Sequence, residues 1–119
     1  MREWDYMERR KLPRYDIALS SEETDLGSLN SFNSVTRDIS EHGVGIISGN
    51  KIDLNSPLDV CLVMPDTQEK IHAQGHVIWV SPIGPGQYRA GIYLGKLGLK
   101  PIPLVLRMIK VQLRSRYYQ

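Results

Sequence analysis

The chain has 119 residues, which is enough for one domain and leaves little room for a second. Hydrophobic residues make up 41% and charged residues 24%, so the chain supports one modest core and wholesale disorder is excluded. The net charge of +2 is too small to define a partner by itself. Basic residues gather in segments 9–14 and 107–116, which favours a local anionic ligand over a long nucleic acid.

The single cysteine and the apolar segments bear on the cellular compartment. Cys61 has no partner for an internal disulfide and lies in an apolar run, where a buried thiol is expected. The first ten residues lack the apolar core of a secretory signal, and no stretch approaches the ~20 apolar residues of a membrane span. We therefore expect a cytoplasmic protein.

Short segments with strand character follow one another between turn residues. Six are predicted, at 15–19, 33–37, 44–48, 58–64, 71–80 and 87–94. The fifth alternates residue by residue, as a half-buried antiparallel strand does, and the sixth is expected to pair with it across a loop rich in proline and glycine. The polar, acidic stretch 20–31 is interpreted as a loop or an irregular hairpin.

The end of the chain changes to a helical period. Pro101 and Pro103 suit the first turn of a helix, and a mostly apolar stripe with i, i+3, i+4 spacing runs from Val105 to Leu113. We expect one helix at about 101–116. Strands followed by a single amphipathic helix predict an all-β fold, a six-stranded antiparallel β-barrel flanked by one α-helix.

A first candidate binding motif lies near the N-terminus. Arg10 and Arg14 are four residues apart, follow Arg9, and enclose Pro13, which disfavours a helix at the residue before it. The guanidinium fork matches a phosphate or the O6 and N7 edge of guanine, and it can stack on a purine. A solvated basic arm is the alternative interpretation.

A second candidate motif spans residues 38–43. In an extended chain, Asp38 and Ser40 share one face and Ile39 takes the other. A carboxylate accepts hydrogen bonds from guanine N1–H and N2–H₂, a hydroxyl reaches a phosphate or a base edge, and Gly43 permits close backbone approach. An ordinary turn at the end of a strand is the alternative.

Together the two motifs resemble those of the PilZ family, bacterial receptors for the second messenger cyclic di-GMP. The family pattern is RxxxR near the N-terminus, then a strand, then [DN]xSxxG, and this sequence has Arg10-xxx-Arg14 and Asp38-x-Ser40-xx-Gly43 in that order. The runs 75–80 and 90–93 are also similar to family strands. The resemblance extends from about Glu8 to the C-terminal helix, with no departure in either motif.

The resemblance implies the roles of individual residues. Arg10 and Arg14, with Arg9 as a third contact, would wrap over cyclic di-GMP, while Asp38, Ser40 and Gly43 would bind a guanine edge and the backbone. The N-terminal segment is expected to order over the ligand and so to signal to a protein partner. Such receptors act in motility, exopolysaccharide synthesis or biofilm control.

Several assignments follow from this interpretation and others stay open. Residues 1–7 are expected to be a tail and 8–119 one domain, with an arm at 9–14. Trp79 is a further candidate ligand-binding residue that could stack on guanine, although it shares its predicted face with Val77, which favours core packing. An Arg37–Asp38 ion pair is one alternative and a solvated Arg37 the other. Ligand stoichiometry, and whether the protein is a monomer or a homodimer, stay open.

The same sequence also bears on catalysis, metal binding and other kinds of binding function. Of the histidines, His72 and His76 are four apart on a strand, roughly 13 Å, which is too far to share one metal. No nucleophile elbow, Walker loop or zinc spacing occurs, so we expect neither catalysis nor a metal or other cofactor. A single-strand nucleic-acid-binding barrel and a ligand-independent protein-interaction module of the same fold are the alternatives.

Overall fold

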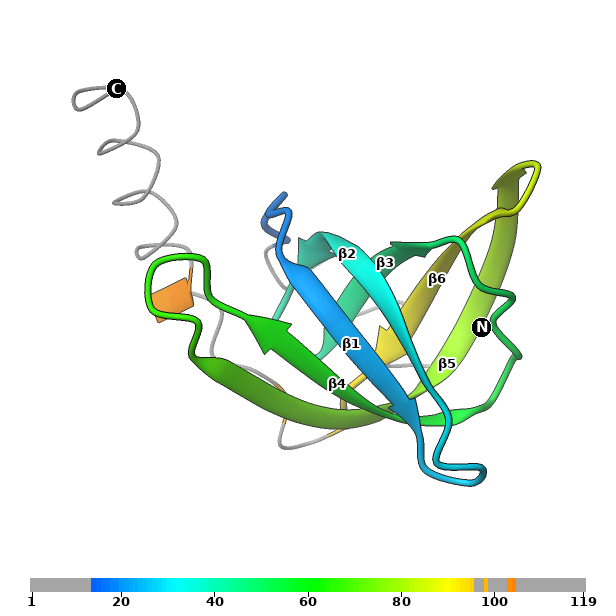
Figure 1. Cartoon of the computed structure of the whole chain (residues 1–119), viewed down its shortest axis with the longest axis horizontal. Coiled ribbons are helices and arrows are strands. Elements are labelled where there is room, and N and C mark those ends of the chain that lie inside the picture. The colour runs from blue at the N-terminus through cyan, green and yellow to red at the C-terminus, as the bar shows by residue number, and fades with distance from the viewer. Residues whose placement is uncertain (1–13, 96–97, 99–102, 105–119) are drawn as a thin grey trace.

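The structure is a computed structural model that describes residues 14–95, 98, 103 and 104. Its strands are β1 (Ser20–Asp25), β2 (Ser31–Ile39), β3 (Gly43–Ser48), β4 (Pro57–Val63), β5 (Lys70–Gly84) and β6 (Gln87–Tyr93). They close in the order β1-β2-β3-β6-β5-β4, and every pairing is antiparallel (Figure 1). The prediction of an all-β, six-stranded antiparallel barrel is confirmed.

The core fills the barrel with the inward-facing residues of its strands. Val44 and Ile46 of β3, and Val60 and Leu62 of β4, are almost completely buried. The predicted helix at about 101–116 lies outside the described residues except for Pro103 and Leu104, and it stays a prediction. Leu104 itself is buried in the core cluster.

The first strand lies at 20–25 and not, as predicted, at 15–19. Residues 15–19 do run beside β2, but only Tyr15 forms a β-bridge, with Ile39. Nearer β1, the Thr36 hydroxyl interrupts the ladder because it accepts a hydrogen bond from Leu19 N–H at 2.8 Å and donates one to Ile17 O. A side chain therefore replaces part of the backbone pairing that a regular strand requires, while Thr36 N–H still donates to Leu19 O at 2.8 Å.

The polar stretch interpreted as a loop is β1 because its inward positions carry a buried polar cluster. Ser21 and Glu23 point into the barrel, and Glu23 has no exposed surface. The Ser34 hydroxyl lies 2.7 and 2.8 Å from the two Glu23 carboxylate oxygens, and the Ser21 hydroxyl donates to one of them at 2.8 Å. Hydrogen bonds satisfy this cluster, so a strand without inward apolar residues still closes the barrel.

Replacing Glu23 by glutamine is expected to stabilise the protein at neutral pH. Burial raises the pKa of the Glu23 carboxyl above its ordinary 4.5, while the hydroxyls of Ser34 and Ser21 lower it by less. The protonated form is thus favoured by folding, and its contribution to stability is full below that ordinary pKa and is lost as pH rises through the folded-state pKa. Glu23→Gln should raise the free energy of unfolding at pH 7 by ~1 kcal/mol.

Urea unfolding of the two proteins between pH 4 and pH 8 tests this expectation. The stability gained by Glu23→Gln should grow with pH across that range. Glu22→Gln is the matched control, because Glu22 belongs to the same strand but is exposed. Parallel stability profiles for wild type and Glu23→Gln would contradict the assignment of a raised pKa.

Candidate ligand-binding site

Two β-bulges decide which side chains reach the outer face of the barrel. On β2, Thr36 pairs with Ile46 but Asp38 pairs with Gly45, so Arg37 is the extra residue. On β5, Val77 pairs with Ile92 but Trp79 pairs with Gly91. Each bulge shifts the alternation of faces by one residue. Asp38 and Trp79 therefore point outward, although Thr36 and Val77 before them point into the core.

The face expected for Trp79 was wrong for this reason. Strict alternation placed it beside Val77, which is fully buried, whereas Val80 packs against the core in its place. Trp79 is half-buried on the outer surface. The preference for core packing is thereby overturned.

The two bulges place four residues in one row across neighbouring strands. Asp38 of β2 pairs with Gly45 of β3, Gly45 pairs with Gly91 of β6, and Gly91 pairs with Trp79 of β5. A carboxylate lies at one end of this row and an indole at the other. The two central residues, Gly45 and Gly91, have no side chains, and both are buried.

At both glycines, a neighbouring side chain occupies the space that a Cβ would take. A Cβ on Gly45 would lie 2.8 Å from Asp38 Oδ1, so the carboxylate leans over β3. A Cβ on Gly91 would lie 2.1 Å from Trp79 Nε1, so the indole lies against the β6 backbone. Neither glycine was recognised from the sequence, because the signal is the cross-strand register that the bulges set.

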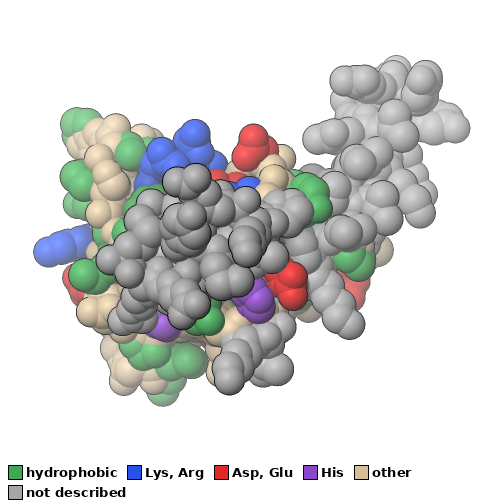
Figure 2. Space-filling model, turned by 180° about the vertical axis from the view of Figure 1, so that it is seen from behind, with side chains coloured by type: hydrophobic (Ala, Val, Ile, Leu, Met, Phe, Trp, Pro, Cys, Tyr) green, Lys and Arg blue, Asp and Glu red, His purple; other side chains and the backbone are tan. Residues whose placement is uncertain are grey.

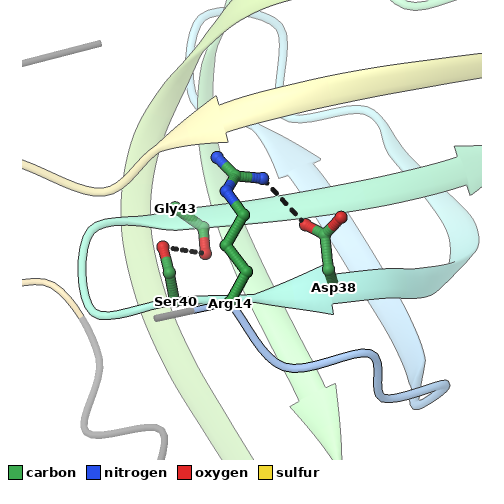
Figure 3. Close-up of polar contacts among 4 residues, drawn as sticks. All are labelled: Arg14, Asp38, Ser40 and Gly43. Atoms are coloured by element: carbon green, nitrogen blue, oxygen red, sulfur yellow. Dashed lines mark hydrogen bonds and ion pairs between the residues drawn. The ribbon is translucent and has the colours of Figure 1, made fainter. Parts of the chain in front are cut away.

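Arg14 completes this face from the segment before β1 (Figure 3). Its Nη1 donates to Asp38 Oδ1 at 3.2 Å. The two side chains are 41% and 17% exposed, so solvent screens the pair and it adds little stability. Its effect is to hold a guanidinium beside a carboxylate. Asp38 pairs with Arg14 in the described structure, and Arg37 is exposed.

The turn between β2 and β3 contains the rest of the second motif. The backbone N–H of Ser40 donates to Gly43 O at 2.8 Å, and the Ser40 hydroxyl lies 3.4 Å from the same oxygen. Ser40 is 1% exposed. The geometry thus shows a structural role for Ser40, which closes the turn that presents Gly43. Whether the hydroxyl also contacts a ligand stays a prediction.

The residues that follow β6 form hydrogen bonds with this turn and pack against it. Leu94 N–H donates to His42 O at 2.8 Å, and His42 Nδ1 lies 2.8 Å from Gly95 O. Gly98 has a φ of +55°, and a Cβ there would lie 2.1 Å from Glu41 O. His42 is therefore part of the packing that fixes the turn.

A shallow pocket joins the two motifs to Trp79. It is lined by Arg14, Gly43, Gly45, Ile78, Trp79 and Gly91, among others. In Figure 2, which views the molecule from behind, Lys and Arg side chains form a patch near the top, next to acidic side chains, and further basic atoms lie at the left edge. Arg9 and Arg10 lie outside the described residues. The described motif residues thus meet on one outer face.

The described residues also bear on metal binding and on membrane crossing. In the described residues, no group of three or more His, Cys, Asp or Glu side chains is arranged to hold a metal ion. Within the same part of the chain, no helix has the length and hydropathy needed to cross a membrane.

The described chain is a closed antiparallel barrel that presents a cation, a carboxylate and an indole on one outer face. Its sequence matches the PilZ domain over residues 8–103. The chain therefore belongs to the PilZ domain family. No curated protein shows significant sequence similarity to it.

Solved structures show the same fold at low sequence identity. The PilZ domain of Escherichia coli YcgR with c-di-GMP has a TM-score of 0.65 and 14% identity, over 91% of this chain and 96% of that one. The Bacillus subtilis inhibitor of motility MotI/DgrA has a TM-score of 0.60 and 11% identity over 93% of this chain. This chain spans only about half of MotI (54%) and of the longer YcgR structure with c-di-GMP (47%).

Proposed function

We propose that the protein is a receptor for cyclic di-GMP and not an enzyme. The observation that carries this proposal is that Arg14, Gly43 and Trp79 line one small pocket on the barrel face, where Asp38 is ion-paired with Arg14. Their chemistry fits a ligand with two guanines and two phosphates. Family membership and the c-di-GMP in the YcgR structures support the same conclusion.

Each group has a task that its geometry allows. The Asp38 carboxylate is suited to accept from guanine N1–H and N2–H₂, and Arg14 supplies a fork of donors to a phosphate or to the Hoogsteen edge of guanine. Trp79 offers its ring to stack on a base. The absence of side chains at Gly45 and Gly91 lets the Asp38 carboxylate and the Trp79 indole lie close to the sheet, where a flat ligand can reach both.

The N-terminal arm is the finer part of the proposal. Arg10 precedes Arg14 by four residues, so its Cα lies within about 14 Å of the pocket-lining residue. Arg9 and Arg10 would then fold over the bound nucleotide and add guanidinium contacts. An ordered arm beside the barrel changes the surface presented to a protein partner, which is the proposed route of signalling.

Hydrogen exchange is expected to detect this ordering. Backbone amides of residues 9–14 should exchange at least tenfold more slowly with saturating cyclic di-GMP, while the amides of β4 should change little. The physical reason is that ordered backbone hydrogen bonds and burial protect amides. Equal exchange rates for residues 9–14 with and without ligand would contradict the proposed arm closure.

A thermal-shift series separates the receptor from its alternatives. A ligand that binds only the folded state raises Tm, by an amount that follows its concentration relative to Kd. Cyclic di-GMP should raise Tm, whereas GTP and cyclic di-AMP should not. A shift with any single-stranded oligonucleotide, lost at high salt, would favour the nucleic-acid barrel. No shift with any nucleotide would favour a protein-interaction module.

A further inference from the structure

Arg89 extends the candidate site beyond the two motifs. It lies on β6, two residues before Gly91, and points to the same outer face. Its guanidinium carbon lies 5.8 Å from the centroid of the Trp79 ring. The sequence gives no hint of this proximity, because the bulge at Ile78 alone brings Trp79 to the face that Arg89 occupies.

In the described part of the chain, the N–H donors of the Arg89 guanidinium form no hydrogen bond or ion pair. Arg14 bonds to Asp38, whereas no carboxylate of the described residues lies within ion-pairing distance of Arg89. Its recorded contact is with the indole face, which uses the charge but none of the planar N–H donors. A half-buried arginine of this kind is available to a bidentate acceptor such as a phosphate.

A purely structural role for Arg89 is less well supported. Trp79 is already held by its packing against the backbone of Gly91, where even a methyl group has no room. At 5.8 Å the cation lies near the outer limit of a cation–π contact, where the contact is weak. The indole therefore does not need Arg89 to keep its place.

We propose that Arg89 is a further ligand-binding residue, which binds a phosphate of the cyclic dinucleotide while Trp79 stacks on one of its guanines. Together with Trp79 it forms the half of the site on β5 and β6, opposite the half formed by Asp38 on β2 and Arg14 from the segment before β1. This inference rests on the proposed function. The ligand then spans the four adjacent strands β2, β3, β6 and β5, with Arg14 on one side of Gly45 and Gly91 and Arg89 on the other.

The test measures cyclic di-GMP affinity of the full chain by calorimetry in a Trp4→Phe background. Because Trp4 and Trp79 are the two tryptophans, emission in that background reports on Trp79. Arg89→Gln, which keeps the aliphatic stem, is expected to weaken binding by ~10-fold or more. Arg89→Lys should lose less because it keeps the charge without the fork. Lys70→Ala, at the far end of β5, is the matched charge control and should bind within about twofold.

The outcomes separate this inference from the proposed function. Trp79 emission should change on binding in the parent, and the ligand-free emission and Tm of Arg89→Gln should match those of the parent. Parent-like affinity of Arg89→Gln overturns the role of Arg89 and leaves the receptor intact. If Arg89→Gln changes the ligand-free emission and Tm, and its affinity falls only in proportion to that change, Arg89 serves to hold Trp79 in place. That result overturns its role as a ligand-binding residue. If the parent does not bind cyclic di-GMP, the proposed function itself is wrong.

Discussion

Asp38→Ala is expected to weaken cyclic di-GMP binding by about 10- to 100-fold, with little loss of stability. Hydrogen bonds to a charged partner contribute about 1.5–3 kcal/mol, and the carboxylate is the acceptor that the described site offers to guanine N–H groups. It also positions Arg14, whose Nη1 lies 3.2 Å away. The ion pair itself is partly exposed, so its loss should change the free energy of unfolding by less than about 1 kcal/mol.

Asp59→Ala is the matched control for this measurement. Asp59 is also a carboxylate on the outer side of a barrel strand, and it pairs with His72 at 2.9 Å. Unlike Asp38, it makes no ion pair with Arg14, which lines the pocket beside Trp79. Its removal should leave the calorimetric Kd unchanged. A Kd for Asp38→Ala within threefold of wild type would show that the ligand does not use this carboxylate.

Gly75→Ala is expected to destabilise the barrel by about 2–4 kcal/mol. A Cβ on Gly75 would lie 2.0 Å from Tyr93 O and 2.8 Å from Tyr93 C. Both are backbone atoms of the neighbouring strand β6, so no side chain can move aside. The strands β5 and β6 must separate instead, which breaks hydrogen bonds of the closed barrel.

Gly84→Ala offers a control within the same strand. There the nearest atom to a new Cβ is Gln87 Oε1 at 3.9 Å, the end of a flexible side chain. Chemical denaturation should show a stability change of less than about 1 kcal/mol for Gly84→Ala. Similar midpoints for Gly75→Ala and wild type would mean that β5 and β6 do not approach as closely as the structure shows.

The sequence predicted the barrel where apolar residues alternate and failed where the inward residues are polar. The strands after the first were located in the correct order, although their ends differ by a few residues. β1 was missed because Ser21 and Glu23 take core positions, and their mutual hydrogen bonds replace apolar burial. Such a cluster depends on Ser34 across the sheet, which local periodicity does not include.

The site residues were predictable as types, but their arrangement was not. The motif residues Arg14, Asp38 and Gly43 were identified from spacing and a family resemblance. Periodicity placed Trp79 on the wrong face, since a bulge is one inserted residue that leaves no mark in the alternation of residue types. The places of Gly45, Gly91 and Arg89 in the site follow only from the cross-strand register of four strands.

The central claim is tested most directly by isothermal titration calorimetry of the full chain with cyclic di-GMP, with GTP and cyclic di-AMP as controls. A site with two cations, a carboxylate and an indole predicts saturable binding of cyclic di-GMP at micromolar or tighter Kd, with no comparable heat from either control. The fitted stoichiometry will also distinguish one bound ligand from a stacked pair. A folded protein that gives no binding heat with cyclic di-GMP, or equal binding of all three nucleotides, would contradict the account.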